Sequence, residues 1–597
     1  MVSLDIDPVT GAPTGVNRVP FHLEDFPIDN AHRRLKIAMI GAGFSGIIAG
    51  VRIPQRLKNV DLSIFEKNYS VREQVPRNCL RHPSPLLHSH FRTKPKLVEL
   101  LCLQVYYFAS LQNTNTDPTL PKAGSEILQY LKDVSAKYKL DKYLRYGHCL
   151  KAANWDEKSG QWTLQFDILN EAGEKVGEKS EVADVVIQGM GGLSRWDWPV
   201  IPGLEDFKGT KLHTAAYEGV ASDQQDKKVA VIGSGSSAIQ IVPTVQPFAK
   251  QIDNYVRGST WIAAPFASKT LLQYQPDGRN YKFTDEDKKL FAEDPVAFAK
   301  FRRSMEDELN SVHQVTLKGS PMQVGAVTHF REDMEKKLKT KPEILSTIIP
   351  TFPVACRRLT PGPGYLEALV EDNAGFVSSP IKTITATGIE TVDGVHREYD
   401  TIICATGFDT SYKPRTPIIG RNGVNVQDLW ADIPTSYLSI AIGPDHPNYF
   451  VVNGPNSSVG SGSLLVMFER EVDYIIAAIS KMQRENIKAM SVKQSAVDDF
   501  MEFIANYFPK TVYSEKCRSW YKKGMELGPV VALWPGSCLH AITAMKNPRW
   551  EDFDYTPVSQ KNRFTWLGNG QTNVEETGEG DRAFYLTDID IPPVPLQ

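Results

Sequence analysis

The sequence predicts an α/β fold of two doubly wound domains, the second inserted into the first and carrying a helical insert. Three observations predict it. An apolar run at 36–40 leads into the glycine-rich hexapeptide GAGFSG, and a second run at 228–232 leads into GSGSSA. A third apolar run, at 400–406, precedes another glycine and predicts that the chain returns there to the first domain.

Each glycine hexapeptide predicts a strand, a tight turn and a helix, as in Rossmann-like domains. Glycine permits the sharp turn and lets a pyrophosphate approach the main chain, and the helix N-terminus attracts the anion. One such turn is weak evidence, but two in this context predict two bound dinucleotides. The residues expected there are Gly41, Gly43, Phe44, Ser45 and Gly46 in the first turn and Gly233, Ser234, Gly235, Ser236, Ser237 and Ala238 in the second.

The residue that ends the next strand indicates which dinucleotide each turn binds. Glu66 lies 25 residues after Gly41, where a carboxylate binds ribose hydroxyls and repels a phosphate, so the first site suits FAD or NAD. Arg257, with Gly258 beside it, ends the matching strand of the second domain and favours the 2′-phosphate of NADP. The alternative is that Glu66 and Arg257 are ordinary solvated strand ends.

Composition agrees with a soluble enzyme of several domains. The chain has 597 residues, 41% of them hydrophobic, and a net charge of −3, which gives no support for nucleic-acid binding. No window reaches the roughly 20 apolar residues that span a bilayer, and the first 35 residues lack a signal-peptide core. The seven cysteines include no Cys-x-x-Cys pair, so we expect thiols in a reducing, cytoplasmic compartment and no metal site.

The two turns also suggest where the domains divide. A small antiparallel sheet is expected from the alternating pattern around 155–168, and the charged segment 284–341 is expected to form helices. The predicted parts are an N-terminal extension (1–34), the first part of the first dinucleotide-binding domain (35–195), the second, NADP-binding domain (196–387), the second part of the first domain with the substrate region (388–550) and a C-terminal tail (551–597).

Several further motifs resemble one family. The run FKGTKLHTAAY at 207–217 resembles the F-x-G-x-x-x-H-x-x-x-W motif of Baeyer–Villiger and related class B flavin monooxygenases, with tyrosine in the last position. The Ala-Thr-Gly at 405–407 and the Cys-Arg-Arg-Leu at 356–359 are also similar to that family. The Gly-Pro-Asn at 454–456 and the Cys-Arg-Ser-Trp-Tyr at 517–521 resemble its fungal steroid-monooxygenase-like branch.

The resemblance covers roughly residues 35–550 and implies an activity. Members of the family use NADPH, FAD and O₂ to insert oxygen beside a ketone, or to hydroxylate, on a small lipophilic substrate. Arg358 falls at the family's catalytic arginine, and a fixed cation there stabilises negative charge on the activated oxygen. A structural ion pair is the alternative for Arg358. His213 is expected to order the hinge between domains rather than to move protons.

One segment departs from the family. After Glu66 the family carries a Gly-Gly-Thr-Trp stretch and an aspartate-bearing run that wrap the flavin, but residues 69–84 here contain neither. As written, the chain would place Arg81 or His82 near Arg358, where a carboxylate is expected, and the like charges would repel.

Two explanations of this departure are open. Shifting the frame by one base over 74–87 allows codons for a run that matches the family, so residues from about 72 to 120 are hypothesised to come from a misplaced splice site or frameshift and to pack poorly. The alternative is a non-redox cyclase or isomerase, or an inactive relative, on the same fold.

Overall fold

The first nucleotide-binding sheet has five parallel strands in the order β21-β9-β3-β4-β5. The computed structural model describes residues 5–6, 13–14, 23–29, 32–69, 123–217, 219–263, 268–273, 283–559 and 562–586. The strands are β3 (Leu35–Ile40), β4 (Val60–Phe65), β5 (Leu144–Arg145), β9 (Val185–Gln188) and β21 (Tyr449–Val451). All but one residue of β3 are buried, which explains its continuous apolar run, because helices cover both faces of a parallel sheet.

Helix α1 (Phe44–Arg56) follows β3 through the first glycine turn, as predicted, and packs against the long helix α12 (Leu464–Arg484). A buried ion pair joins the two helices, with Arg52 Nη2 2.7 Å from Glu469 Oε2. Helix α3 (Ala123–Lys137) also contacts α1. Segments more than 400 residues apart therefore share one core, which confirms that the chain leaves the first domain and returns to it.

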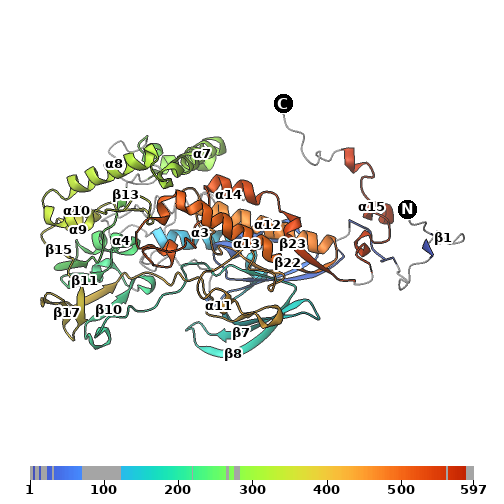
Figure 1. Cartoon of the computed structure of the whole chain (residues 1–597), viewed down its shortest axis with the longest axis horizontal. Helices are drawn as coiled ribbons and strands as arrows, with labels where there is room; N and C mark the ends of the chain where they lie inside the picture. Colours follow the sequence, from blue (N-terminus) through green and yellow to red (C-terminus); the bar gives the residue numbers. More distant parts are fainter. Residues whose placement is uncertain are drawn as a thin grey trace.

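The second sheet is also five-stranded and parallel, in the order β10-β19-β11-β12-β15. Its strands are β10 (Thr210–His213), β11 (Lys228–Ile232), β12 (Gln251–Tyr255), β15 (Ala374–Val377) and β19 (Thr401–Cys404). Helices α4 (Ser236–Val245) and α10 (Tyr365–Leu369) cover it, and the second glycine turn lies between β11 and α4. The two doubly wound domains predicted from sequence are confirmed (Figure 1).

The predicted point of return to the first domain is wrong. Strand β19 lies between β10 and β11, inside the second sheet, so the second domain continues to Cys404 rather than ending at 387. The chain rejoins the first sheet later, where β21 pairs with β9. A strand that is buried on both faces is apolar throughout, so its sequence does not show which of two parallel sheets it joins.

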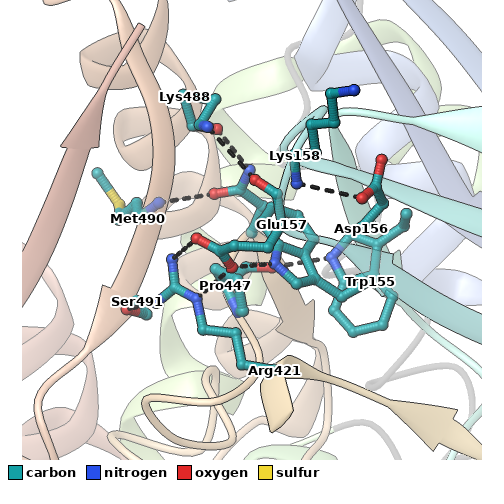
Figure 2. Close-up of polar contacts among 11 residues, drawn as sticks. Trp155, Asp156, Glu157, Lys158, Arg421, Pro447, Lys488, Met490 and Ser491 are labelled. Carbon is teal, nitrogen blue, oxygen red and sulfur yellow. Dashed lines mark hydrogen bonds and ion pairs between the residues drawn. The ribbon is translucent and has the colours of Figure 1, made fainter. Parts of the chain in front are cut away.

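The expected small antiparallel sheet is present as β6 (His148–Asp156), β7 (Gln161–Leu169) and β8 (Lys175–Ala183), extended by β20 (Ile418–Ile419). Figure 2 shows how its first turn is attached to the rest of the molecule. Arg421 Nε lies 2.7 Å from Glu157 Oε2, and Arg421 Nη1 donates to Ser491 Oγ on β22 (Ile487–Val492).

The expected insert at 284–341 is helical, with α6 (Asp285–Glu293), α7 (Pro295–Ser311) and α8 (Pro321–Lys337). Helices α7 and α8 lie along the top of Figure 1. Helices α13 (Gln494–Tyr507) and α14 (Cys538–Met545) form the C-terminal layer beside α12. The predicted start of the C-terminal tail at residue 551 is too early in the sequence. Strand β23 (Phe553–Pro557) still belongs to the folded domain, since it pairs with β22 and Phe553 is buried.

The remaining elements are short. They are β1 (Asp5–Ile6), β2 (Pro13–Thr14), β13 (Ile262–Ala263), β14 (Thr360–Pro361), β16 (Ile381–Ile384), β17 (Gly388–Thr391), β18 (His396–Glu398), α5 (Ser268–Leu271), α9 (Leu345–Ile348), α11 (Val426–Leu429) and α15 (Asn573–Thr577). Within the ranges that the structure describes, no helix combines the length and apolar character that a membrane crossing requires.

The cysteine prediction is wrong for one pair. Cys356 and Cys517 form a disulfide, whereas Cys149, Cys404 and Cys538 are free. The bridged residues are 161 positions apart, so no local spacing in the sequence marks them as partners. With this bridge, cysteine content no longer supports a reducing compartment.

Candidate active site

The first glycine turn has no room for side chains at its two ends. Gly41 has φ +104°, and a Cβ there would lie 2.6 Å from Gly189 O at the end of β9. A Cβ on Gly46 would lie 2.1 Å from Gly41 O. The turn therefore brings its main chain close to the start of α1, where a pyrophosphate is expected, and Gly43 caps that helix without a side-chain bond.

Glu66 helps to shape this turn. Its side chain is buried, with Oε2 accepting the Ala42 N–H at 2.9 Å and Oε1 accepting the Asn68 N–H at 2.9 Å. The alternative of a solvated strand end does not hold for Glu66. A carboxylate has about four acceptor positions, so binding to ribose hydroxyls is compatible with these contacts and stays a prediction. Phe44 and Ser45 in the first turn of α1 are buried.

The second glycine turn has open space at its middle glycine, where a dinucleotide is expected to contact the main chain. Gly233 has φ +132°, and a Cβ there would lie 2.4 Å from Ala405 O. Gly235 caps α4, and no atom of the described chain lies within 4 Å of a Cβ built on it. Ser234 Oγ donates to Gly258 O at 3.2 Å, and Ser236 Oγ lies 2.6 Å from Thr360 Oγ1. Ser237 is half-buried and Ala238 is buried in α4.

Asn254 supports the second turn and was not predicted from sequence. It is 1% exposed, and its Nδ2 donates to Val231 O and to Gly233 O, the latter at 2.9 Å. Its Oδ1 accepts the Tyr365 hydroxyl at 2.8 Å. An amide in the middle of an apolar strand was the available signal, because buried polar groups need partners.

Two arginines act on each other electrostatically beyond the end of β12. Arg257 is exposed, which fits both a phosphate ligand and the alternative of a solvated strand end, so its role stays a prediction. Arg357, from the segment after α9, is half-buried and donates from Nη1 to Ser259 O at 2.9 Å. Burial lowers the pKa of Arg357, and the nearby charge of Arg257 lowers it further. The two guanidinium charges therefore act on each other, and the sequence alone gave no signal that Arg357 would lie within reach of Arg257.

Arg358 is exposed and lies against the C-terminal part of the chain. Burial raises the pKa of Tyr521, and the charge of Arg358 and its hydrogen bond to the Tyr521 hydroxyl partly offset that rise. The Cys356–Cys517 bridge joins the same two segments. Arg358 therefore lies at the junction of the second nucleotide domain and the C-terminal layer. Arg81 and His82, expected opposite it, lie outside the described residues.

His213 has the surroundings of a structural residue, as expected. It is 2% exposed, its Nδ1 accepts the Ala215 N–H at 3.1 Å, and its ring stacks on Trp196 at 4.3 Å. Its Nε2 lies 3.1 Å from the hydroxyl of Thr406, just after β19. Burial lowers the pKa of His213, so the ring is neutral and links β10 to the segment that leaves the second domain.

Glu471 on α12 is the most strongly perturbed carboxyl group near the ends of the first-sheet strands. It is fully buried, and one oxygen accepts the Asn453 N–H at 2.8 Å just after β21. The other oxygen has no hydrogen-bond partner among the described residues. Burial raises its pKa to about 8, so the group is mostly protonated at neutral pH.

The Glu471 carboxyl is expected to make the free energy of unfolding depend on pH. Between its ordinary pKa of 4.5 and about 8, the folded protein holds a proton that the unfolded chain releases. The contribution of Glu471 to the free energy of unfolding should therefore fall by about 1.4 kcal/mol per pH unit as pH rises through this window. Glu471→Gln should remove that slope and be more stable than the original near pH 8, measured by urea unfolding. Identical pH slopes for the two proteins would contradict the assignment.

The fold and the two glycine turns are those of a protein that binds two dinucleotides. The chain belongs to the class B flavin monooxygenases and is a flavin-dependent monooxygenase. The model of flavin-binding monooxygenase-like proteins matches residues 102–270. The chain is 36% identical to the FAD-binding monooxygenase tazF of Aspergillus terreus over 563 residues, which is 93% of this chain and 95% of the relative.

Other comparisons agree. A Baeyer–Villiger monooxygenase of Pseudomonas aeruginosa is 29% identical and matches 85% of this chain and 89% of its own. The closed crystal structure of cyclohexanone monooxygenase aligns with a TM-score of 0.68 at 22% identity, covering 88% of this chain and all of that one. Oxidised steroid monooxygenase bound to NADP aligns with a TM-score of 0.64 at 22% identity, over 88% of this chain and all of that one. These structural likenesses confirm the fold.

Proposed function

We propose that this protein uses FAD, NADPH and O₂ to insert oxygen beside the carbonyl of a lipophilic ketone, or to hydroxylate such a compound. The observation that carries the proposal is the position of Arg358, on the segment that links the second nucleotide domain to the C-terminal layer. The same segment carries Arg357, whose pKa is lowered by the charge of Arg257. One stretch of chain would thus supply Arg357 to the nucleotide and Arg358 to the reacting centre.

The first turn fits FAD. A Cβ at Gly41 or Gly46 would collide with main-chain oxygens of the protein itself, so both glycines are needed for the tight turn before α1, the kind of turn that holds a pyrophosphate in Rossmann-like domains. Glu66 would bind the ribose, since its carboxylate already lies on the turn at Ala42 N–H. When bound, FAD stores the electrons and activates O₂, chemistry that no side chain supplies.

The second turn fits NADPH. The open space at Gly235 leaves room for a pyrophosphate at the start of α4. Arg257 and Arg357 would then bind the 2′-phosphate with charge-assisted hydrogen bonds. Steroid monooxygenase, whose fold this chain shares, binds NADP in its solved structure, and that supports the assignment.

Removing Arg257 should change cofactor preference. Arg257→Ala is expected to raise KM for NADPH roughly 10- to 100-fold and to leave KM for NADH nearly unchanged, because only NADPH carries the 2′-phosphate. Steady-state oxidation of both cofactors measures this. Arg484→Ala, which removes an exposed arginine at the end of α12, is the control. An unchanged NADPH-to-NADH ratio in Arg257→Ala would overturn the role of Arg257.

Arg358 would stabilise negative charge on the activated oxygen. A guanidinium keeps its charge under nearly all conditions and presents several donors in a fixed plane. Such a preorganised cation favours the deprotonated, nucleophilic form of an oxygen species next to it. Arg358 is therefore the residue we assign to the reacting centre.

Colour and isotope transfer test the proposed function. Purified protein should be yellow from bound FAD and should oxidise NADPH. With ¹⁸O₂ it should place one ¹⁸O atom in the ester, lactone or hydroxylated product of a ketone from a panel including cyclohexanone and progesterone. A colourless protein that converts a substrate without NADPH would favour the non-redox alternative. The similarity to FAD-binding monooxygenases over 93% of the chain supports the oxidative function.

The origin of the segment from about 72 to 120 stays a hypothesis. The segment lies outside the described residues, so its expected poor packing stays a prediction as well. Sequencing the transcript across codons 66–126 decides whether the frame is shifted. If the frame is shifted, the chain as written should bind FAD weakly or not at all, whereas a restored frame should bind FAD and oxidise NADPH, because the family's flavin-wrapping run would return. Stoichiometric FAD in the chain as written would refute the frameshift.

A further inference from the structure

The segment that carries Arg358 is attached firmly on one side. Arg357 donates to Ser259 O, Thr360 Oγ1 lies 2.6 Å from Ser236 Oγ, and β14 pairs with β13. All of these partners belong to the second nucleotide domain. These contacts hold the residues before and after Arg358 and do not involve its side chain. By themselves they would therefore let the guanidinium point in several directions.

On its other side, the Arg358 segment is joined to a compact loop, residues 515–526, here called the C-terminal loop. Its centre is Lys522, which is 0% exposed and donates from Nζ to Glu515 O at 2.6 Å and Glu526 O at 2.8 Å. Cys517 N–H donates to Glu526 O at 3.1 Å, which closes the loop. Tyr521 is 2% exposed and lies edge-on to Tyr513, so its hydroxyl is held in one place.

The Cys356–Cys517 bridge joins these two sides next to Arg358. Both cysteines are buried, at 0% and 3% exposure. Ala355, just before the bridge, has φ +70°, a conformation that alanine adopts only when its surroundings impose it. The bridge therefore fixes the path of the main chain directly before Arg358.

We propose that the Cys356–Cys517 disulfide and the Tyr521 hydroxyl are positioning elements for Arg358. The bridge sets the distance between the arginine segment and the C-terminal loop, and Tyr521 accepts a hydrogen bond that orients the guanidinium. This inference rests on the proposed function, in which Arg358 serves the reacting centre. A bridge that only stabilised the fold would change the unfolding temperature and would leave the reaction of folded molecules unchanged.

The bridge itself is tested without any activity. Peptide mapping of the full chain under non-reducing conditions should recover the Cys356 peptide linked to the Cys517 peptide, and reduction should separate them. Recovery of two alkylated, unlinked peptides from native protein would overturn the inference and leave the proposed function standing.

Positioning is tested with Cys356→Ser, Cys517→Ser and Tyr521→Phe, and with Cys149→Ser, a free and half-buried cysteine, as the control. Tyr521→Phe keeps the bridge and the ring, so it remains informative if the serine variants fold poorly. Each of the three variants should lower oxygen transfer per NADPH by about tenfold and release hydrogen peroxide instead. KM for NADPH and the rate of flavin reduction should stay within about twofold of the original.

The outcomes separate the two proposals. A tenfold loss of coupling with unchanged KM in Tyr521→Phe and either serine variant supports positioning. Unchanged coupling in Tyr521→Phe, or losses in KM and flavin content that parallel a lower unfolding temperature, overturn it in favour of a purely structural bridge. A parent protein whose transcript confirms the reading frame, and that shows no flavin and no NADPH oxidation with the bridge intact in the peptide map, would instead refute the proposed function.

Discussion

An Arg358→Ala protein is expected to bind FAD and oxidise NADPH but to lose oxygen transfer to ketones by about 10²- to 10³-fold. Arg358 is exposed, so its removal leaves no cavity, and folding should be unaffected. The lost cation would no longer stabilise negative charge on the activated oxygen, and NADPH oxidation would produce hydrogen peroxide. Product formed per NADPH consumed measures this directly.

Two variants sharpen the Arg358 experiment. Arg358→Lys keeps the charge but not the planar set of donors, so it should recover only part of the coupling. Arg484→Ala removes an exposed arginine on α12 and should match the original protein. An Arg358→Ala protein that keeps its yield of product per NADPH would show that Arg358 is a structural residue, the alternative considered from sequence.

A second large effect is expected at the first glycine turn. A Cβ on Gly46 would lie 2.1 Å from Gly41 O, a main-chain atom that cannot move without shifting β3 or α1. Gly46→Ala should therefore lose about 3 kcal/mol or more of unfolding free energy and retain little FAD. Urea unfolding and flavin absorbance after gel filtration measure the two effects.

Gly235→Ala, in the second glycine turn, is the control for this change. It lies at the N-cap of α4, the position that Gly43 holds at α1, with φ −87° and, apart from its chain neighbours, no described atom within 4 Å of the added Cβ. Its unfolding free energy should stay within about 0.5 kcal/mol of the original, while NADPH binding weakens, because the methyl group would occupy the space assigned to the pyrophosphate. Equal losses of stability in Gly46→Ala and Gly235→Ala would contradict this difference between the turns.

Local motifs were sufficient to predict the main architecture. The turns after β3 and β11, the helices that follow them and the helical insert are all where their patterns indicate. These features depend on short-range chemistry: the conformational freedom of glycine, the length of apolar runs and helical periodicity. The resemblance to class B flavin monooxygenases rests on motifs of the same local kind, and the relatives confirm it.

Features that depend on distant parts of the chain were not predicted. The position of β19 in the second sheet was missed because a fully apolar strand fits either sheet. Arg357 was missed because its approach to Arg257 depends on how the insert returns to the nucleotide domain. Asn254 was missed because its three partners belong to β11, the second glycine turn and α10.

By itself, the sequence determined the class of this protein: two glycine turns, a carboxylate after one and an arginine after the other, and the motifs of a monooxygenase family. Only the tertiary structure decided how Arg358 is held. Cys356 and Cys517 lie 161 residues apart, and neither has a neighbouring cysteine to suggest a pair. Their bridge exists because two separate parts of the chain pack together, and such packing depends on the whole core rather than on any local pattern.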